Sequence, residues 1–190
     1  MTTVLGVDPG SVVTGYALLA ESGNQFTCVH SGQIALGAGD LTGRLTRLFR
    51  ELTRILEVRR PQCVAVESAF HAKSVRSALV LGHARGVALL VAARATLPVH
   101  EYAPARVKRS VGAGGAGDKD AVGRMVHALL GLTESGRHDA ADALAVAVCH
   151  LNHARFGKAH VARGAARRPS ALAALAGRLS PSYQRFGAAR

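Results

Sequence analysis

The chain has 190 residues, of which 48% are hydrophobic and 4% aromatic, and it carries a formal net charge of +12. This composition supplies enough apolar side chains for a folded core and excludes global disorder. The three cysteines are scattered, without the spacing of a zinc knuckle or a disulfide framework, which predicts a reducing, cytoplasmic location.

Three strands are expected first, over 3–7, 12–20 and 26–34. The turn-forming residues DPG separate the first two strands and Gly-Asn separates the next two, so the three strands are expected to form an antiparallel meander. The apolar spacing then changes to that of a helix over 41–59, which places Leu and Ile on one side and Arg on the other.

The second half alternates short strands with helices. Strands are expected over 63–66 and 98–102, a helix over 74–95, and a helical turn over 105–111, as judged from apolar runs and their Pro or Gly boundaries. A glycine-rich loop over 112–117 precedes helices expected over 120–130 and 139–153. This order predicts an α/β fold with a five-stranded mixed sheet, antiparallel at first and parallel later, with helices on both faces.

The charge divides the chain into two parts. No acidic residue follows Asp142, and the segment from Arg155 to Arg190 holds eight basic residues. We therefore expect a folded domain over 1–154 and a basic, flexible tail over 155–190, with nucleic acid as the first candidate partner. The most apolar long stretch, 78–95, is interrupted by charged residues, so no membrane partner is expected, and no signal peptide is expected either.

Four acidic residues lie at positions where a catalytic or metal-binding role explains them better than a structural role. Asp8 and Glu67 each end an apolar strand, and Asp139 and Asp142 begin an apolar helix. Taken singly, these residues have ordinary structural explanations, because Asp favours turns and helix N-caps. Together they would repel one another near an apolar core unless cations neutralise them.

Carboxylate oxygens without a His or Cys cluster suit Mg²⁺, with Mn²⁺ as a substitute. Two such ions are a common apparatus for hydrolysing a phosphodiester. In a basic protein, four carboxylates of this kind predict a metal-dependent nuclease with Asp8, Glu67, Asp139 and Asp142 as catalytic and metal-binding residues.

Five sequence blocks in order strengthen this prediction: LGVDPGSVVTGYALL, VAVESAF, SALVLGHARGVALLVAA, YAPARVKRSVGAGGAGDKDAV and HDAADALAVAVCH. Over about 1–153 the chain resembles the RuvC family of bacterial Holliday-junction resolvases. The resemblance implies a ribonuclease H-like fold and a homodimer that makes paired, symmetric nicks in four-way DNA junctions during recombination and repair. It also implies the RuvA–RuvB branch-migration complex as a partner.

The same resemblance matches the four acids to the family's catalytic metal ligands. It matches Phe70 to an aromatic residue that stacks or wedges at the junction, and Lys108 and Lys119 to basic residues implicated in DNA binding and catalysis. His138, directly before the third acid, is a candidate for handling a proton.

Further basic residues are candidates for phosphate contacts, with a solvated helix face as the alternative. They lie near the second acid and before the glycine-rich loop: Lys73, Arg76, Arg106 and Arg109. The GAGGAGDK stretch does not match a P-loop, so no nucleotide cofactor is expected. His150 and His153 have the spacing of metal ligands but are interpreted as surface histidines.

Three alternatives to a junction resolvase remain open from the sequence. They are a related nuclease acting on RNA or flaps, a junction-binding protein without catalysis, and, more distantly, an actin-like ATPase.

Overall fold

The computed structural model describes residues 1–68, 74–113, 119–132 and 140–165, with side chains omitted for 119–120 and 156–165. Contacts within the chain divide it into two units, Met1–His153 and Ala154–Arg190. The sheet and the site described below lie in the first unit.

A five-stranded sheet forms the centre of this unit. Its strands are β1 (Thr2–Asp8), β2 (Val13–Ser22), β3 (Gln25–Ala35), β4 (Cys63–Glu67) and β5 (Val99–Tyr102). They lie in the order β3-β2-β1-β4-β5. The pairs β1–β2 and β2–β3 are antiparallel, whereas β1–β4 and β4–β5 are parallel. The predicted meander, the later parallel strands and the strand number are confirmed.

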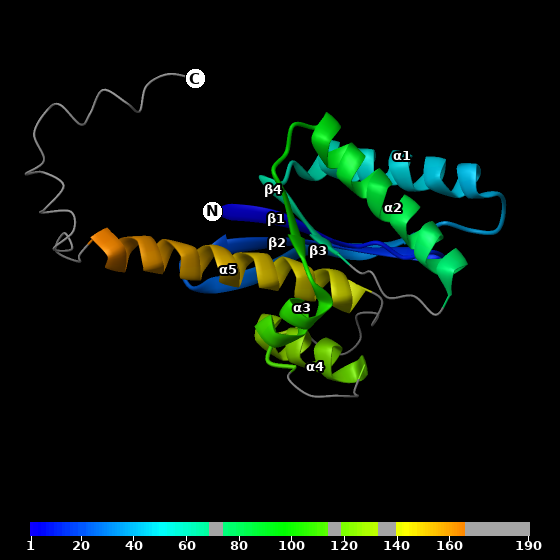
Figure 1. The fold of residues 1–190 in the computed structure, drawn as a ribbon. Helices are drawn as coiled ribbons and strands as arrows, with labels where there is room; N and C mark the ends of the chain where they lie inside the picture. Colours follow the sequence, from blue (N-terminus) through cyan, green and yellow to red (C-terminus); the bar gives the residue numbers. More distant parts are fainter. Residues whose placement is uncertain (69–73, 114–118, 133–139, 166–190) are drawn as a thin grey trace, which may run out of the picture. The chain divides into compact units, whose positions relative to one another are not determined.

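Two helices cover one face of the sheet (Figure 1). Helix α1 (Leu41–Arg59) begins at the N-cap Asp40, whose carboxylate accepts a 3.0 Å hydrogen bond from the Gly43 amide. Helix α2 (Val75–Arg94) begins at the N-cap Ser74. Aliphatic side chains of both helices and of β1 and β4 form one continuous core on this side. This face contains leucine, valine, isoleucine and alanine, and its function is packing.

Helix α2 also has the length and apolar composition of a membrane-crossing helix, and it is the one such helix among the described residues. A core helix of a soluble protein passes the same test. Ala84, Ala88, Val91 and Ala92 are buried in the core that α2 shares with α1 and the sheet. Core packing accounts for this side of α2 only, because 22% of its apolar stretch is buried and Val75, Leu79 and Leu90 remain exposed.

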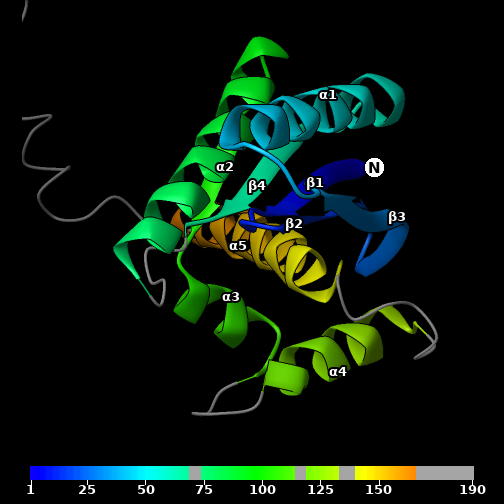
Figure 2. The same ribbon diagram turned by 90° about the vertical axis from the view of Figure 1, so that its right-hand side faces the viewer.

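The opposite face is covered by α5 (Ala141–Ala165), with α3 (Pro104–Ser110) and α4 (Lys119–Leu130) beyond it (Figure 2). The side of α5 that meets the sheet is rich in alanine and valine. A Cβ added to Gly6 of β1 would lie 2.2 Å from the Ala143 carbonyl oxygen and 2.9 Å from the Ala147 Cβ. Glycine at position 6 therefore lets α5 approach β1 closely. The helix expected over 139–153 is confirmed as an element, but it ends later, at Ala165.

Candidate active site

The alternation of side chains along β1 and β4 places two of the predicted acids on one face. Val4 and Cys63 point into the core beneath α5, whereas Val7 and Val66 belong to the core beneath α1 and α2. Because strand side chains alternate, Asp8 and Glu67 lie on the α5 face. Val7 is paired with Val66 in the parallel ladder, so Asp8 and Glu67 end adjacent strands side by side.

The third acid comes from the beginning of α5. Asp142 is an exposed residue in the first turn of this helix, one residue before the Ala143 carbonyl that approaches Gly6. The close contact between helix and strand therefore brings Asp142 toward Asp8. The charge of Asp142 acts on both Asp8 and Glu67, and this places the three carboxyls in one site.

The electrostatics of the three acids favour a cation between them. Burial raises the pKa of Glu67 to about 8, and the neighbouring charges of Asp8 and Asp142 contribute to this rise. Burial also raises the pKa of Asp8, although its hydrogen bond with Glu67 opposes that rise. Without metal, the two strand-end carboxyls share a proton at neutral pH. A divalent cation would replace that proton, and oxygen-only donors suit a hard cation.

Helix α3 places positive charge beside the acids. Glu67 pairs with Tyr102 in the ladder, and α3 begins two residues after Tyr102. The charge of the exposed Lys108 lowers the pKa of Glu67, so this positive charge lies near the site. Arg106 and Arg109 are also exposed on α3, and Arg76 is exposed in the first turn of α2. Within the described part of the chain, no hydrogen bond or ion pair joins Arg76, Arg106 or Arg109 to Asp8 or Glu67.

Several predicted site residues lie outside the described residues: Phe70, Lys73, His138 and Asp139. The backbone of Lys119 begins α4, but its side chain is not described. The structure therefore brings together Asp8, Glu67, Asp142 and Lys108 from the predicted set.

Two features of this face were not singled out from the sequence. Gly6 determines the approach of α5, and its signal was a glycine inside an otherwise apolar strand, which often marks close backbone contact. His150, interpreted as a surface histidine, is in fact buried, with 8% of its surface exposed. A histidine within an unbroken apolar helix sequence was the available signal for that burial.

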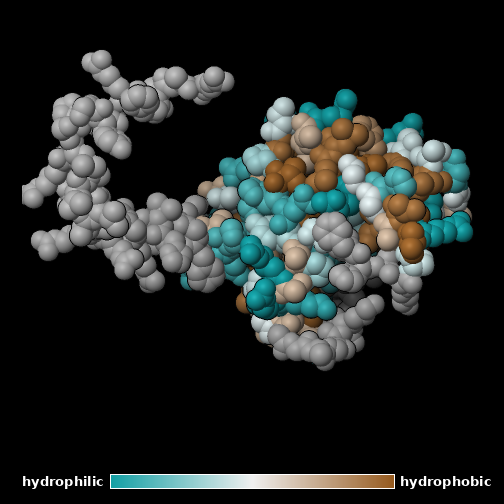
Figure 3. All heavy atoms as spheres, viewed as in Figure 1, coloured by the Kyte–Doolittle hydropathy of each residue, from teal (hydrophilic) through white to brown (hydrophobic). Residues whose placement is uncertain are grey.

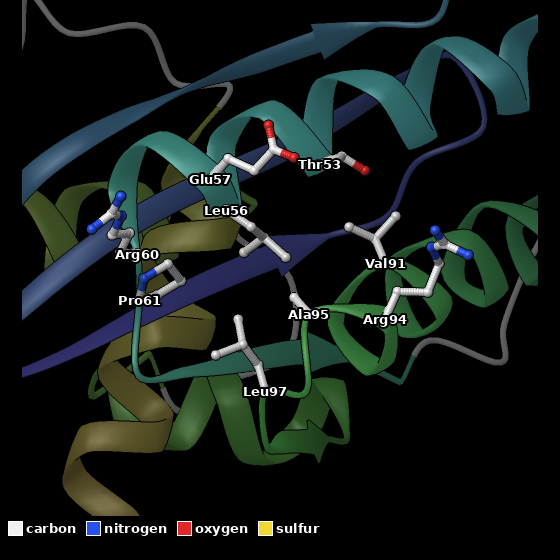
Figure 4. Close-up of a pocket in the computed structure, with 9 residues that line it drawn as sticks. All are labelled: Thr53, Leu56, Glu57, Arg60, Pro61, Val91, Arg94, Ala95 and Leu97. Atoms are coloured by element: carbon white, nitrogen blue, oxygen red, sulfur yellow. The ribbon is translucent and has the colours of Figure 1, made fainter.

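A separate hollow lies between α1 and α2 (Figure 4). It has a volume of about 390 Å³ and is lined mostly by aliphatic and arginine side chains, with Glu57 as its one acidic residue. It belongs to the packing face of the sheet, so it is not the site that the three convergent acids form.

The chain has clear relatives among known proteins. The family model described as "Crossover junction endodeoxyribonuclease RuvC" matches residues 4–150. The RuvC of Myxococcus xanthus is 52% identical over 188 residues, which cover 96% of this chain and 97% of that protein. The RuvC of Halorhodospira halophila is 47% identical over 154 residues, covering 80% and 92%.

Solved structures agree on the fold. Thermus thermophilus RuvC in complex with a Holliday junction substrate superimposes with a TM-score of 0.76 at 32% identity, covering 83% of this chain and 97% of that one. The yeast mitochondrial Holliday junction resolvase, at 16% identity and a TM-score of 0.58, shares the fold alone. The predicted ribonuclease H-like fold is confirmed.

Proposed function

The chain belongs to the RuvC family of crossover junction endodeoxyribonucleases, and from this premise we propose that it resolves four-way DNA junctions at the site formed by Asp8, Glu67 and Asp142. It is a hydrolase of phosphodiester bonds in DNA. The observation that carries the site assignment is the convergence of three carboxyls from β1, β4 and α5, with Asp8 hydrogen-bonded to Glu67. We assign Asp139 to the same site as the fourth carboxylate.

These carboxylates fit divalent metal ions, and we propose two Mg²⁺ per site, with Mn²⁺ as a substitute. Bound metal ions would activate water and stabilise the charge that develops on the leaving oxygen. The protein's part is to hold the carboxylates at a fixed, partly buried edge of the sheet. Glu67 must release its proton when a cation binds, because burial and its acidic neighbours keep it protonated up to a pH of about 8.

The basic residues around this edge position the DNA backbone. The charge of Lys108 acts on Glu67, so a phosphate contacting this lysine would lie near the acids. We assign supporting phosphate contacts to Lys73, Arg76, Arg106, Arg109 and Lys119, and a stacking role to Phe70. His138 is assigned to proton handling beside Asp139. The basic tail over 155–190 adds affinity that does not depend on DNA sequence.

A second copy of the chain is the proposed partner along α2. The exposed side of this helix carries Val75, Leu79 and Leu90, which are 79%, 60% and 53% exposed. Figure 3 shows hydrophobic residues gathered over this part of the molecule. A Cβ added to Gly82 or Gly86 would meet nothing within 4 Å in this chain, so both leave room for an approaching helix. A homodimer would present two active sites for paired, symmetric nicks.

By resemblance, we also propose that the dimer works in the cytoplasm with the RuvA–RuvB branch-migration complex.

A substrate panel tests this function. Wild-type protein in Mg²⁺ is incubated with a four-way junction, a linear duplex, a flap and an RNA–DNA hybrid of matched length. We expect paired nicks in the junction and no comparable cleavage of the others. Preferred cleavage of the flap or hybrid would favour a related nuclease, and junction binding without nicks in any divalent ion would favour a purely architectural protein.

A further inference from the structure

A second group of metal-ligating side chains lies on the α5 face, away from the acids. Cys63 is the first residue of β4, His100 lies on β5, and His150 lies on α5. One ligand atom from each of these residues lies within 4.8 Å of the other two. Three separate elements therefore direct a thiol and two imidazoles at one point.

The hydrogen bonds of His150 already have the arrangement of a metal ligand. Its Nε2 lies 3.4 Å from the Cys63 Sγ, and its Nδ1 lies 2.9 Å from the Tyr102 hydroxyl oxygen. In a tetrahedral zinc site, sulfur and nitrogen ligands are about 3.5 Å apart. A ligating histidine also usually donates its other ring N–H to a nearby oxygen, which fixes its orientation. The Tyr102 hydroxyl is placed to accept that bond.

His100 is the member of this group that is accessible to solvent. Its ring centroid lies 4.4 Å from that of His150, yet the residue is exposed on β5. Cys63 and His150 are buried, so a cation could enter from the side of His100 and bind to a rigid pair beneath it. A water molecule would complete the four ligands of a tetrahedral ion.

We propose that Cys63, His100 and His150 form a binding site for a zinc-type divalent cation, distinct from the magnesium site of the carboxylates. Thiolate and imidazole donors favour zinc-type ions, whereas carboxylates favour Mg²⁺ and Mn²⁺. His150 and Asp142 are eight residues apart on α5, which corresponds to about 12 Å along the helix. The two sites are therefore separated in space and in chemistry.

The protonation states define the cost of binding. Burial, with the nearby His100 and His153, lowers the pKa of His150 to about 4, so its ring is neutral and able to bind a cation at neutral pH. Burial raises the pKa of Cys63 to about 11, so a bound cation must displace the thiol proton. This cost selects for cations with a strong preference for sulfur.

Cobalt(II) titration of the full chain in excess Mg²⁺ tests the proposal. Co²⁺ bound to a thiolate gives a charge-transfer absorption that carboxylate sites do not give. We expect this absorption to saturate at one Co²⁺ per chain and to disappear when Zn²⁺ is added. Cys63→Ser should abolish it, whereas Cys149→Ser, a matched change at another buried cysteine, and Cys28→Ser should retain it.

A surface variant keeps the test independent of folding. His100→Ala changes an exposed side chain, and loss of this ligand should weaken Co²⁺ binding by about a hundredfold or more. Asp8→Asn should leave the thiolate absorption unchanged, because that residue belongs to the other site. Absence of the absorption in the wild-type protein, its persistence in Cys63→Ser, or unchanged affinity in His100→Ala would overturn the proposal.

Discussion

Glu67 and Cys63 are the two ends of β4, lie on the same face of the sheet, and meet different parts of α5. At the carboxyl end, Glu67 lies with Asp8 and the exposed Asp142, beside the cationic Lys108. At the other end, Cys63 lies against the buried His150. The same strand and helix thus hold hard oxygen donors at an accessible edge of the sheet and softer sulfur and nitrogen donors in a buried position. An edge where a helix begins suits a substrate as large as DNA.

Removal of a carboxylate at the accessible end of β4 should have the largest effect on activity. Glu67→Gln preserves shape but removes an oxygen that we propose binds metal, and we expect junction cleavage to fall by about a thousandfold, or ~4 kcal/mol in transition-state stabilisation. Single-turnover cleavage in Mg²⁺ measures this. Glu57→Gln, an exposed acid on the packing face, is the matched control and should cleave at the wild-type rate. Equal rates for both variants would remove Glu67 from the site.

The contact between α5 and β1 supports both groups of side chains, at the two ends of β4. Its disruption should have the next largest effect. Gly6→Ala would place a methyl group 2.2 Å from the Ala143 carbonyl oxygen. Overpacking of this kind costs about 1–3 kcal/mol in the free energy of unfolding. Chemical denaturation measures that loss, and Gly6→Val should lose more. Unchanged stability in both variants would show that α5 does not approach β1 as described.

The shared proton at the accessible end predicts a pH-dependent stability without metal. The pKa of Glu67 is raised to about 8 in the folded state from a usual value of 4.5. Below about pH 4 the carboxyl is protonated in both states, and as pH rises the unfolded chain loses this proton first. Metal-free protein should therefore lose thermal stability between about pH 4.5 and 8. Mg²⁺ should restore it, and Glu67→Gln should flatten the profile; a flat wild-type profile would contradict this prediction.

A smaller effect is expected from the cation beside the acids. Lys108→Gln removes the phosphate contact that we propose for this lysine and should reduce cleavage by about tenfold. It should also move the pH profile of cleavage toward alkaline values, because Lys108 lowers the pKa of Glu67. Arg50→Gln, an exposed cation on α1, controls for loss of net charge and should leave the profile in place. A lysine with only a structural role would not move the profile.

The sequence predicted the parts of this arrangement that depend on local pattern. Apolar runs ending in Asp8 and Glu67 predicted two strand ends, and the register of the parallel pair confirms that these residues are neighbours. Asp142 was expected at a helix start, where it lies. These positions follow from periodicity and from the rule that parallel strands end at the same edge.

Features that depend on tertiary contact could not be predicted. The proton shared by Asp8 and Glu67 arises from burial and from the nearby Asp142. The group of Cys63 and His150 joins residues 87 positions apart, and a helical spacing of histidines alone does not reveal a thiol from another element. The role of Gly6 also depends on Ala143 and Ala147, which lie on α5 far along the chain.

The most direct test of the central claim is single-turnover cleavage of a four-way junction by Asp8→Asn beside the wild-type protein. The change removes a carboxylate and leaves every basic residue in place. The account predicts that the variant binds the junction with wild-type affinity and makes no detectable nick in Mg²⁺. Cleavage at the wild-type rate would contradict the assignment of the active site to the carboxyl ends of β1 and β4.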